Sequence, residues 1–151
     1  MKYRIDAGET AAAMGRRLFT QEGFSCSEAV LCAMAAWWGI DEPGIPRIAT
    51  PFRGGICGAQ LGICGALSGG LMAIGLRLGR DSADQDASAC VQAGKSFLKE
   101  VSDEGALDCR TITGKDFSDP EQYQVFHDEI RGDVCAGLIE RCCQWLAQNI
   151  K

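Results

Sequence analysis

Cysteine is the residue of this chain with the most chemistry to offer, because nine of its 151 residues are cysteines. Two of them stand in a seven-residue phrase, Ile-Cys-Gly-Ala-x-x-Gly, that occurs at 56–62 and again at 63–69. A thiolate is a nucleophile in thiol exchange and also a ligand for soft metals. Because the cysteine count is odd, complete pairing within one chain is excluded and at least one thiol is left over.

Four of the nine cysteines fall near the starts of predicted helices. There the unpaired backbone N–H groups and the helix dipole favour an anion, and the pKa of a thiol often falls below its usual value of about 8.5. We therefore predict that these four are the site residues, acting as thiolates in redox exchange or as metal ligands. They are Cys26, Cys64, Cys109 and Cys135.

Other cysteines have simpler interpretations. Cys32 and Cys90 fall within apolar helical stripes, where cysteine behaves as a small hydrophobic residue. Cys142 and Cys143 are neighbours on one predicted helix, so their side chains diverge. Cys142 follows Cys135 by seven residues on the same helix face, which leaves open whether it joins the site.

Several familiar cysteine chemistries are disfavoured by the residues around them. The chain has one histidine, His127, on a polar segment where we expect it to be solvated, so a Cys–His hydrolase ranks low. No C-x-x-C-H motif is present, which argues against c-type haem attachment. No C-x-x-C motif is present either, so a redox pair must come from two different helices.

Composition and charge narrow the class of protein. The 46% hydrophobic and 23% charged residues are typical of a compact globular domain, and the net charge of −5 argues against a nucleic-acid partner. Charges near the N-terminus precede any apolar signal core, so we expect a cytoplasmic protein. The uncharged stretch at 61–76 is too short to cross a bilayer, so we expect no membrane insertion. The redox partner or small-molecule substrate is left open, as is a homo-oligomer.

Hydrophobic periodicity predicts helices throughout, and strand signals are sparse. We expect an all-α, single-domain bundle over residues 1–151, with a buried glycine-rich helix near its centre. Ser25 and Glu28 form a capping-box pattern at the start of the second helix. The expected helices span 7–21, 26–38, a short piece near 45–49, 61–79, 84–104, a turn at 109–114, 118–130 and 133–150.

The glycine-rich helix at 61–79 carries small residues at helical spacing. Gly65, Gly69 and Gly70 lie with Ala66 and Ala73 where another backbone could approach closely. Each interior glycine costs about 0.5–1 kcal/mol relative to alanine. We therefore expect this helix to be crowded by a neighbouring helix or a ligand.

Four segments taken together resemble a known family. The run CGALSGGLMAIGLRLG at 64–79, preceded by GFSCSEAVL at 23–31 and followed by DCRTITG at 108–114 and VC at 134–135, is similar to redox-active proteins named for their signature, C_GCAxxG_C_C. The resemblance extends from about residue 19 to 143. It implies a redox function and places the four characteristic cysteines on Cys26, Cys64, Cys109 and Cys135.

The repeated phrase offers the family box twice. Only the second copy continues into the expected GGLMAIGL, so Cys64 takes the family role. Cys57 is the additional cysteine, and either a local duplication or a resolving thiol would explain it.

Three hypotheses remain open. The first is thiol–disulfide exchange by a thiol-dependent oxidoreductase that uses the four site cysteines, with a reversible disulfide as its working state. The second is an iron–sulfur cluster or zinc held by the same four thiolates, although their dispersed spacing is unusual for a metal site. The third is a helical protein whose cysteines are mainly structural.

Overall fold

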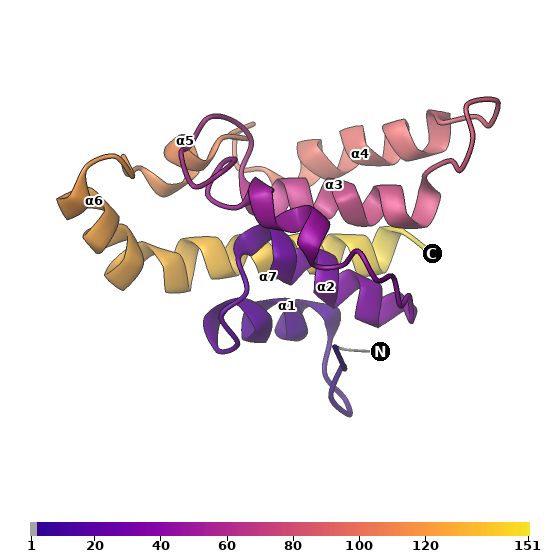
Figure 1. The fold of residues 1–151 in the computed structure, drawn as a ribbon, viewed down its shortest axis with the longest axis horizontal. Coiled ribbons are helices and arrows are strands. Elements are labelled where there is room, and N and C mark those ends of the chain that lie inside the picture. Colours follow the sequence, from indigo (N-terminus) through magenta and orange to yellow (C-terminus); the bar gives the residue numbers. More distant parts are fainter. Residues whose placement is uncertain (1–2) are drawn as a thin grey trace.

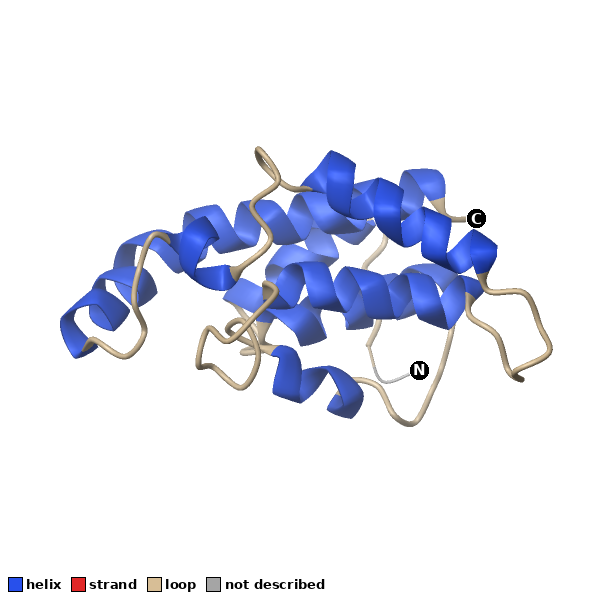
Figure 2. Cartoon of the chain, turned by 90° about the horizontal axis from the view of Figure 1, so that it is seen from above, coloured by secondary structure: helices blue, strands red, loops and turns tan. Residues whose placement is uncertain are grey.

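The structure, a computed structural model, describes residues 3–151, and over these residues it consists of helices and loops without a β-strand (Figure 2). The all-α prediction is confirmed. The elements are α1 (Ala11–Thr20), α2 (Cys26–Trp38), the 3₁₀-helix η1 (Arg47–Phe52), α3 (Gly65–Leu78), α4 (Ser88–Val101), α5 (Cys109–Thr113), α6 (Pro120–Val125), the π-helix η2 (Phe126–Cys135) and α7 (Ala136–Asn149).

The start of α2 is fixed by the capping box that the sequence predicts. The Ser25 hydroxyl accepts a hydrogen bond from the Glu28 amide at 3.4 Å, and the Glu28 carboxylate accepts one from the Ser25 amide at 2.8 Å. Gly39, with φ of 68°, ends the helix in the left-handed conformation. As a result Cys26 is the first residue of α2.

Helix α2 is buried along most of its length. It packs against α1, α3 and α7, and its residues from 29 to 36 are all buried. Figure 1 shows α1, α2, α3 and α4 arranged around the long α7. Helix α3 buries its first half, which includes Gly65, Gly69 and Gly70, while its last turns are more open.

The glycines of α3 allow the close helix packing that the sequence predicts. A Cβ atom added at Gly69 would lie 2.5 Å from the backbone oxygen of Ser27 in α2. A Cβ atom at Gly70 would overlap the ring of Phe97 in α4. The small residues therefore let α3 contact two neighbouring helices at distances that no larger residue would permit.

Three helices begin later than predicted. α1 begins at Ala11 rather than at residue 7, and the Thr10 hydroxyl caps it by accepting a hydrogen bond from the Ala13 amide at 3.1 Å. α3 begins at Gly65 rather than at residue 61, since Ile63 pairs with Asp108 in an isolated antiparallel bridge. α4 begins at Ser88 rather than at residue 84, and the carboxylate of Asp86 accepts a hydrogen bond from the Ser88 amide at 3.0 Å.

The predicted helix start at residue 133 is wrong. Helices α6, η2 and α7 follow one another without a break from Pro120 to Asn149, and Figure 1 shows them as one continuous run. Asp133 makes no cap, because η2 continues through it in a π-helical pattern of i→i+5 hydrogen bonds. Cys135 therefore lies inside a helix and not near a helix N-terminus.

None of the helices within residues 3–151 has the length and apolar character needed to cross a membrane.

Two matched substitutions in α3 test the close packing. We expect Gly69→Ala to melt lower, because overpacking against Ser27 costs about 1–3 kcal/mol. We expect Gly75→Ala to melt higher by the equivalent of about 0.5–1 kcal/mol, since nothing lies within 4 Å of its added Cβ. Thermal unfolding by circular dichroism measures both, and a Gly69→Ala variant as stable as Gly75→Ala would contradict the role given to Gly69.

Candidate functional site

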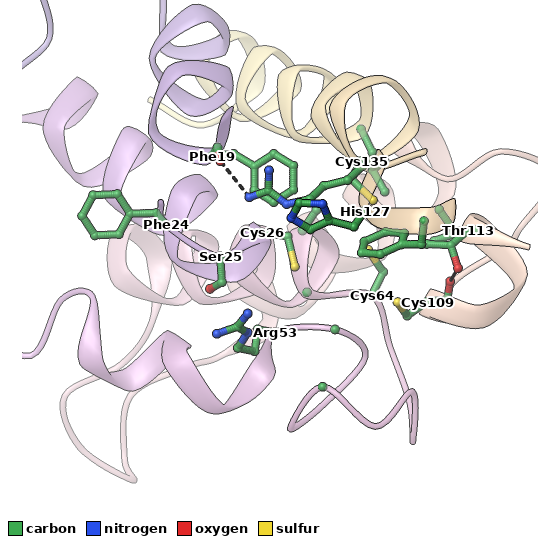
Figure 3. Close-up of a pocket in the computed structure, with 18 of the residues that line it drawn as sticks. Phe19, Phe24, Ser25, Cys26, Arg53, Cys64, Cys109, Thr113, His127 and Cys135 are labelled. Atoms are coloured by element: carbon green, nitrogen blue, oxygen red, sulfur yellow. Dashed lines mark hydrogen bonds between the residues drawn. The ribbon is translucent and has the colours of Figure 1, made fainter. Parts of the chain in front are cut away.

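Four cysteines from distant segments line one cavity of about 440 Å³. They come from the first turn of α2, the residue before α3, the first turn of α5 and the last residue of η2. Figure 3 shows the four side chains around a common space. They are Cys26, Cys64, Cys109 and Cys135, the same residues that the sequence singles out.

The structure holds Cys26 and Cys64 together through the glycine that follows Cys64. A Cβ atom at Gly65 would overlap the Sγ atom of Cys26, so only glycine leaves room for this sulfur beside the start of α3. The glycine of the CGAxxG box thus makes room for the sulfur of Cys26, and a charge on Cys26 would act on Cys64.

A short bridge brings Cys109 to the same place. The Cys64 amide donates a hydrogen bond to the Leu107 carbonyl at 2.7 Å, next to the pairing of Ile63 with Asp108. Asp108 then caps α5, and its carboxylate accepts a hydrogen bond from the Thr111 amide at 2.8 Å. The bridge and the cap together fix Cys109 at the start of α5, beside Cys64.

The two copies of the repeated phrase have different structures. In the first copy, Ile56, Cys57 and Gln60 all have positive φ angles, of 76°, 53° and 53°, and form a left-handed loop. The second copy instead leads into α3. Cys57 is exposed on the loop and does not line the cavity. The first copy therefore supplies a loop beside the thiols and no fifth thiol to the pocket.

Gln60, at the end of that loop, links three neighbouring segments. Its amide nitrogen donates to the Lys115 carbonyl at 2.8 Å and lies 3.8 Å from the Cys109 sulfur. Its amide oxygen accepts a hydrogen bond from the Phe117 amide at 2.9 Å. Gln60 thereby holds the first copy of the phrase against α5 and the segment that follows it.

The prediction that helix starts lower the pKa values of these thiols is wrong. Burial raises the pKa of Cys109 to about 11 and that of Cys135 to about 12. Burial also raises the pKa of Cys26 and that of Cys64. Cys64 and Cys109 are only 7% and 5% exposed, so the cost of desolvating a thiolate outweighs the nearby backbone amides.

The four thiols also act on one another. A negative charge on Cys26 would raise the pKa values of Cys64, Cys109 and Cys135, although burial is the larger cause for each. Cys26 is thus the one cavity cysteine whose charge would act on all three of the others. The mutual effect follows from gathering four groups that would all carry the same charge.

Two arginines act in the opposite direction. Arg53 lowers the pKa of Cys26, and Arg131 lowers that of Cys135, although neither effect overcomes burial. Both arginines line the cavity. Sequence analysis missed both arginines, since an isolated arginine in a loop or a polar helix has no distinguishing pattern.

His127 is largely exposed to solvent, as predicted, and also lines the cavity. Its side chain is 60% exposed, and its Nδ1 atom lies 3.2 Å from the Asp128 carboxylate. It nevertheless lines the cavity, as Figure 3 shows, which the expectation of a solvated side chain did not foresee. The π-helix carries His127, Arg131 and Cys135 to the cavity at intervals of four residues.

The remaining cysteines lie outside the cavity lining. Cys32, Cys142 and Cys143 are completely buried in the core, and Cys90 is half-buried on α4. Burial raises the pKa of Cys142, as would charges on Cys143 and Cys64. Cys142 is therefore a core residue close enough to Cys64 to sense its charge, but it does not line the cavity.

No cluster of three or more histidine, cysteine, aspartate or glutamate side chains within residues 3–151 is arranged to hold a metal ion. The four thiols share the cavity but are not drawn together into a coordination shell.

The family comparison agrees with the site. A family model described as "Putative redox-active protein (C_GCAxxG_C_C)" matches residues 24–149. The chain belongs to this family. The match begins two residues before Cys26 and includes all four cavity cysteines. No curated protein and no solved structure gives a significant match.

Burial of Cys109 predicts a pH dependence of stability. Above about pH 8.5, the usual cysteine pKa, the unfolded chain releases this proton, whereas the folded protein keeps it until its pKa of about 11. The free energy of unfolding should therefore fall as the pH rises through this range, by up to about 1.4 kcal/mol per pH unit for one thiol. Urea unfolding from pH 7 to 11 measures it.

Cys109→Ser is the matched variant, because serine does not titrate in this range. Its free energy of unfolding should fall less steeply between pH 8.5 and 11 than that of the unmodified chain. Equal slopes would show that the Cys109 proton does not contribute.

Proposed function

We propose that this member of the family is a thiol redox protein that forms a reversible disulfide between Cys26 and Cys64. The observation that carries the proposal is the convergence of four thiols, from four separate segments, on one cavity. Three other cysteines, Cys32, Cys142 and Cys143, are fully buried in the core without lining the cavity, so burial of cysteine in this chain does not by itself require this convergence.

Cys26 is best suited to be the attacking thiol. It is half-buried, whereas Cys64 is buried. The backbone amides of Gly54 and Ser27 and the charge of Arg53 all favour its thiolate. Since the thiolate is the nucleophile, these groups lower the free energy needed to activate Cys26.

Cys64 is the proposed resolving thiol because Gly65 places the Cys26 sulfur beside it. In the exchange, the Cys26 thiolate attacks one sulfur of an external disulfide and releases one thiolate. Cys64 then attacks the Cys26 sulfur of the mixed disulfide and releases the second. The two cysteines lose two electrons to the external disulfide, and their two protons go to the two thiols that leave.

Substitution of Cys64 tests this pair. We expect Cys64→Ser to abolish formation of the intramolecular disulfide and to stop the reaction at a mixed disulfide on Cys26. We expect Cys90→Ser to behave like the unmodified chain, because Cys90 is half-buried on α4, away from the cavity. Peptide mapping by mass spectrometry after exposure to a small disulfide measures both products.

The Cys90→Ser control tests whether Cys26 and Cys64 are the reacting pair. Equal loss of the disulfide in Cys64→Ser and Cys90→Ser would contradict the proposed pair. A disulfide that maps to Cys109 and Cys135 in the unmodified chain would move the reaction to the other two thiols.

A soft metal or an iron–sulfur cluster is a second candidate. The observation in its favour is the same convergence of four thiols on one cavity, although no group of three or more ligand side chains within residues 3–151 is arranged to hold a metal. Cys26, Cys64, Cys109 and Cys135 would then serve as ligands, with iron–sulfur or zinc as the group held.

Purification without oxygen separates the two candidates. For the thiol mechanism we expect a colourless protein with less than one equivalent of metal and with reversible loss of two thiols on mild oxidation. Visible absorption with stoichiometric iron, or a full equivalent of zinc lost in the Cys64→Ser variant, would instead favour the cluster or metal site.

A further inference from the structure

The charge of the cavity wall is opposite to that of the protein. The chain has a net charge of −5, with 20 acidic residues, yet no aspartate or glutamate lines the cavity within the described part of the chain. Arg53 and Arg131 do line it. An excess of positive side chains in a cavity of an acidic protein favours an anionic occupant.

The thiols do not cancel this charge near neutral pH. The raised pKa values of Cys109, about 11, and Cys135, about 12, keep both groups protonated there. The same direction of shift holds for Cys26 and Cys64. The arginines are therefore the charged groups that an entering molecule meets.

Arg131 is held rigidly at the wall. It donates a hydrogen bond to the Phe19 carbonyl at 2.9 Å, and its guanidinium carbon lies 4.0 Å from the centre of the Phe19 ring. Figure 3 draws this hydrogen bond beside Cys135 and His127. A guanidinium has five N–H donors, so donors remain for a further acceptor.

Arg53 also lines the cavity, and Figure 3 labels it among the residues that surround Cys26. Its guanidinium makes no ion pair with any residue of the described chain. The charge of Arg53 helps to lower the pKa of Glu28, but the Glu28 carboxylate already accepts hydrogen bonds from the Ser25 amide and the Thr50 hydroxyl. Arg53 can therefore contact a bound anion.

The rest of the wall is apolar and the space is small. Phe24, Phe117 and Phe126 line it, and its volume of about 440 Å³ lies within the usual range of about 300–1,000 Å³ for small-molecule sites. The cavity suits a molecule with an apolar middle and negative ends.

From these features we infer that the external disulfide is a small molecule that carries carboxylate groups. The inference rests on the proposed thiol function and adds the class of substrate. One carboxylate contacts Arg53 and another contacts Arg131, while the S–S bond lies between the apolar walls next to Cys26. In this exchange, two cysteine thiols and one dicarboxylate disulfide give one cysteine disulfide and two carboxylate thiols.

A charge series of three disulfides of similar length tests the inference. They are 3,3′-dithiodipropionate with two negative charges, 2-hydroxyethyl disulfide with none, and cystamine with two positive charges. The rate of thiol loss is measured for reduced protein carrying Cys57→Ser, which removes the exposed thiol. Each rate is divided by the rate for N-acetylcysteine amide, to correct for the intrinsic reactivity of each disulfide.

We expect the corrected rate for the dianion to exceed that for the dication by about tenfold or more at low salt, and the preference to shrink in high salt. Arg53→Gln should reduce the preference severalfold and Arg53→Lys should restore it. Arg77→Gln, an exposed arginine at the far end of α3, should leave it unchanged.

The outcomes separate this inference from the proposed function. Equal corrected rates, or faster reaction with the dication, would overturn the substrate class and leave the thiol function standing. Reaction with none of the three would overturn both.

Discussion

Close contact between α2 and α3 is the constraint on which the rest of the structure depends. The missing side chain of Gly69 leaves room for the backbone carbonyl of Ser27, and that of Gly65 leaves room for the Cys26 sulfur. Each glycine gives up helix stability, and each lets a specific group of α2 come nearer. The same contact therefore closes the core and places the Cys26 sulfur against the residue that follows Cys64, so one set of glycines serves both the packing and the candidate site.

Burial has two opposite effects on the thiols. It excludes water and brings Cys26, Cys64, Cys109 and Cys135 to one cavity, but it also raises their pKa values and makes the thiolates costly. Arg53 and the amides near Cys26 partly offset this cost at one cysteine. In the proposed exchange, this partial offset is the reason for giving Cys26 the attacking role.

Much of the architecture could be predicted from sequence because its signals are local. The capping box at Ser25 and the small residues of α3 each specify their own neighbourhood, and the structure agrees with them. The gathering of the cysteines was also predictable from the family resemblance. By contrast, the pKa directions depend on desolvation by residues far away in the chain, and a helix start alone gave the wrong sign.

The other differences between the predicted and the observed structure arise from interactions between segments far apart in the sequence. The continuous run through Asp133 could not be foreseen, since the residues there read as a helix start and the π-helical pattern has no simple sequence signature. Arg53, Arg131 and Gln60 were missed for a related reason: each acquires its role from what lies opposite it in the fold.

The π-helix that ends at Cys135 has a consequence for the order in which the protein is made. Cys26, Cys64 and Cys109 are synthesised first, but the wall that carries Cys135 and Arg131 arrives only with the continuous helical run that ends in α7. α7 also packs against α1, α2 and α3. A growing chain thus holds three incompletely enclosed thiols until α7 leaves the ribosome, because the same helical run completes the cavity wall and packs against the core.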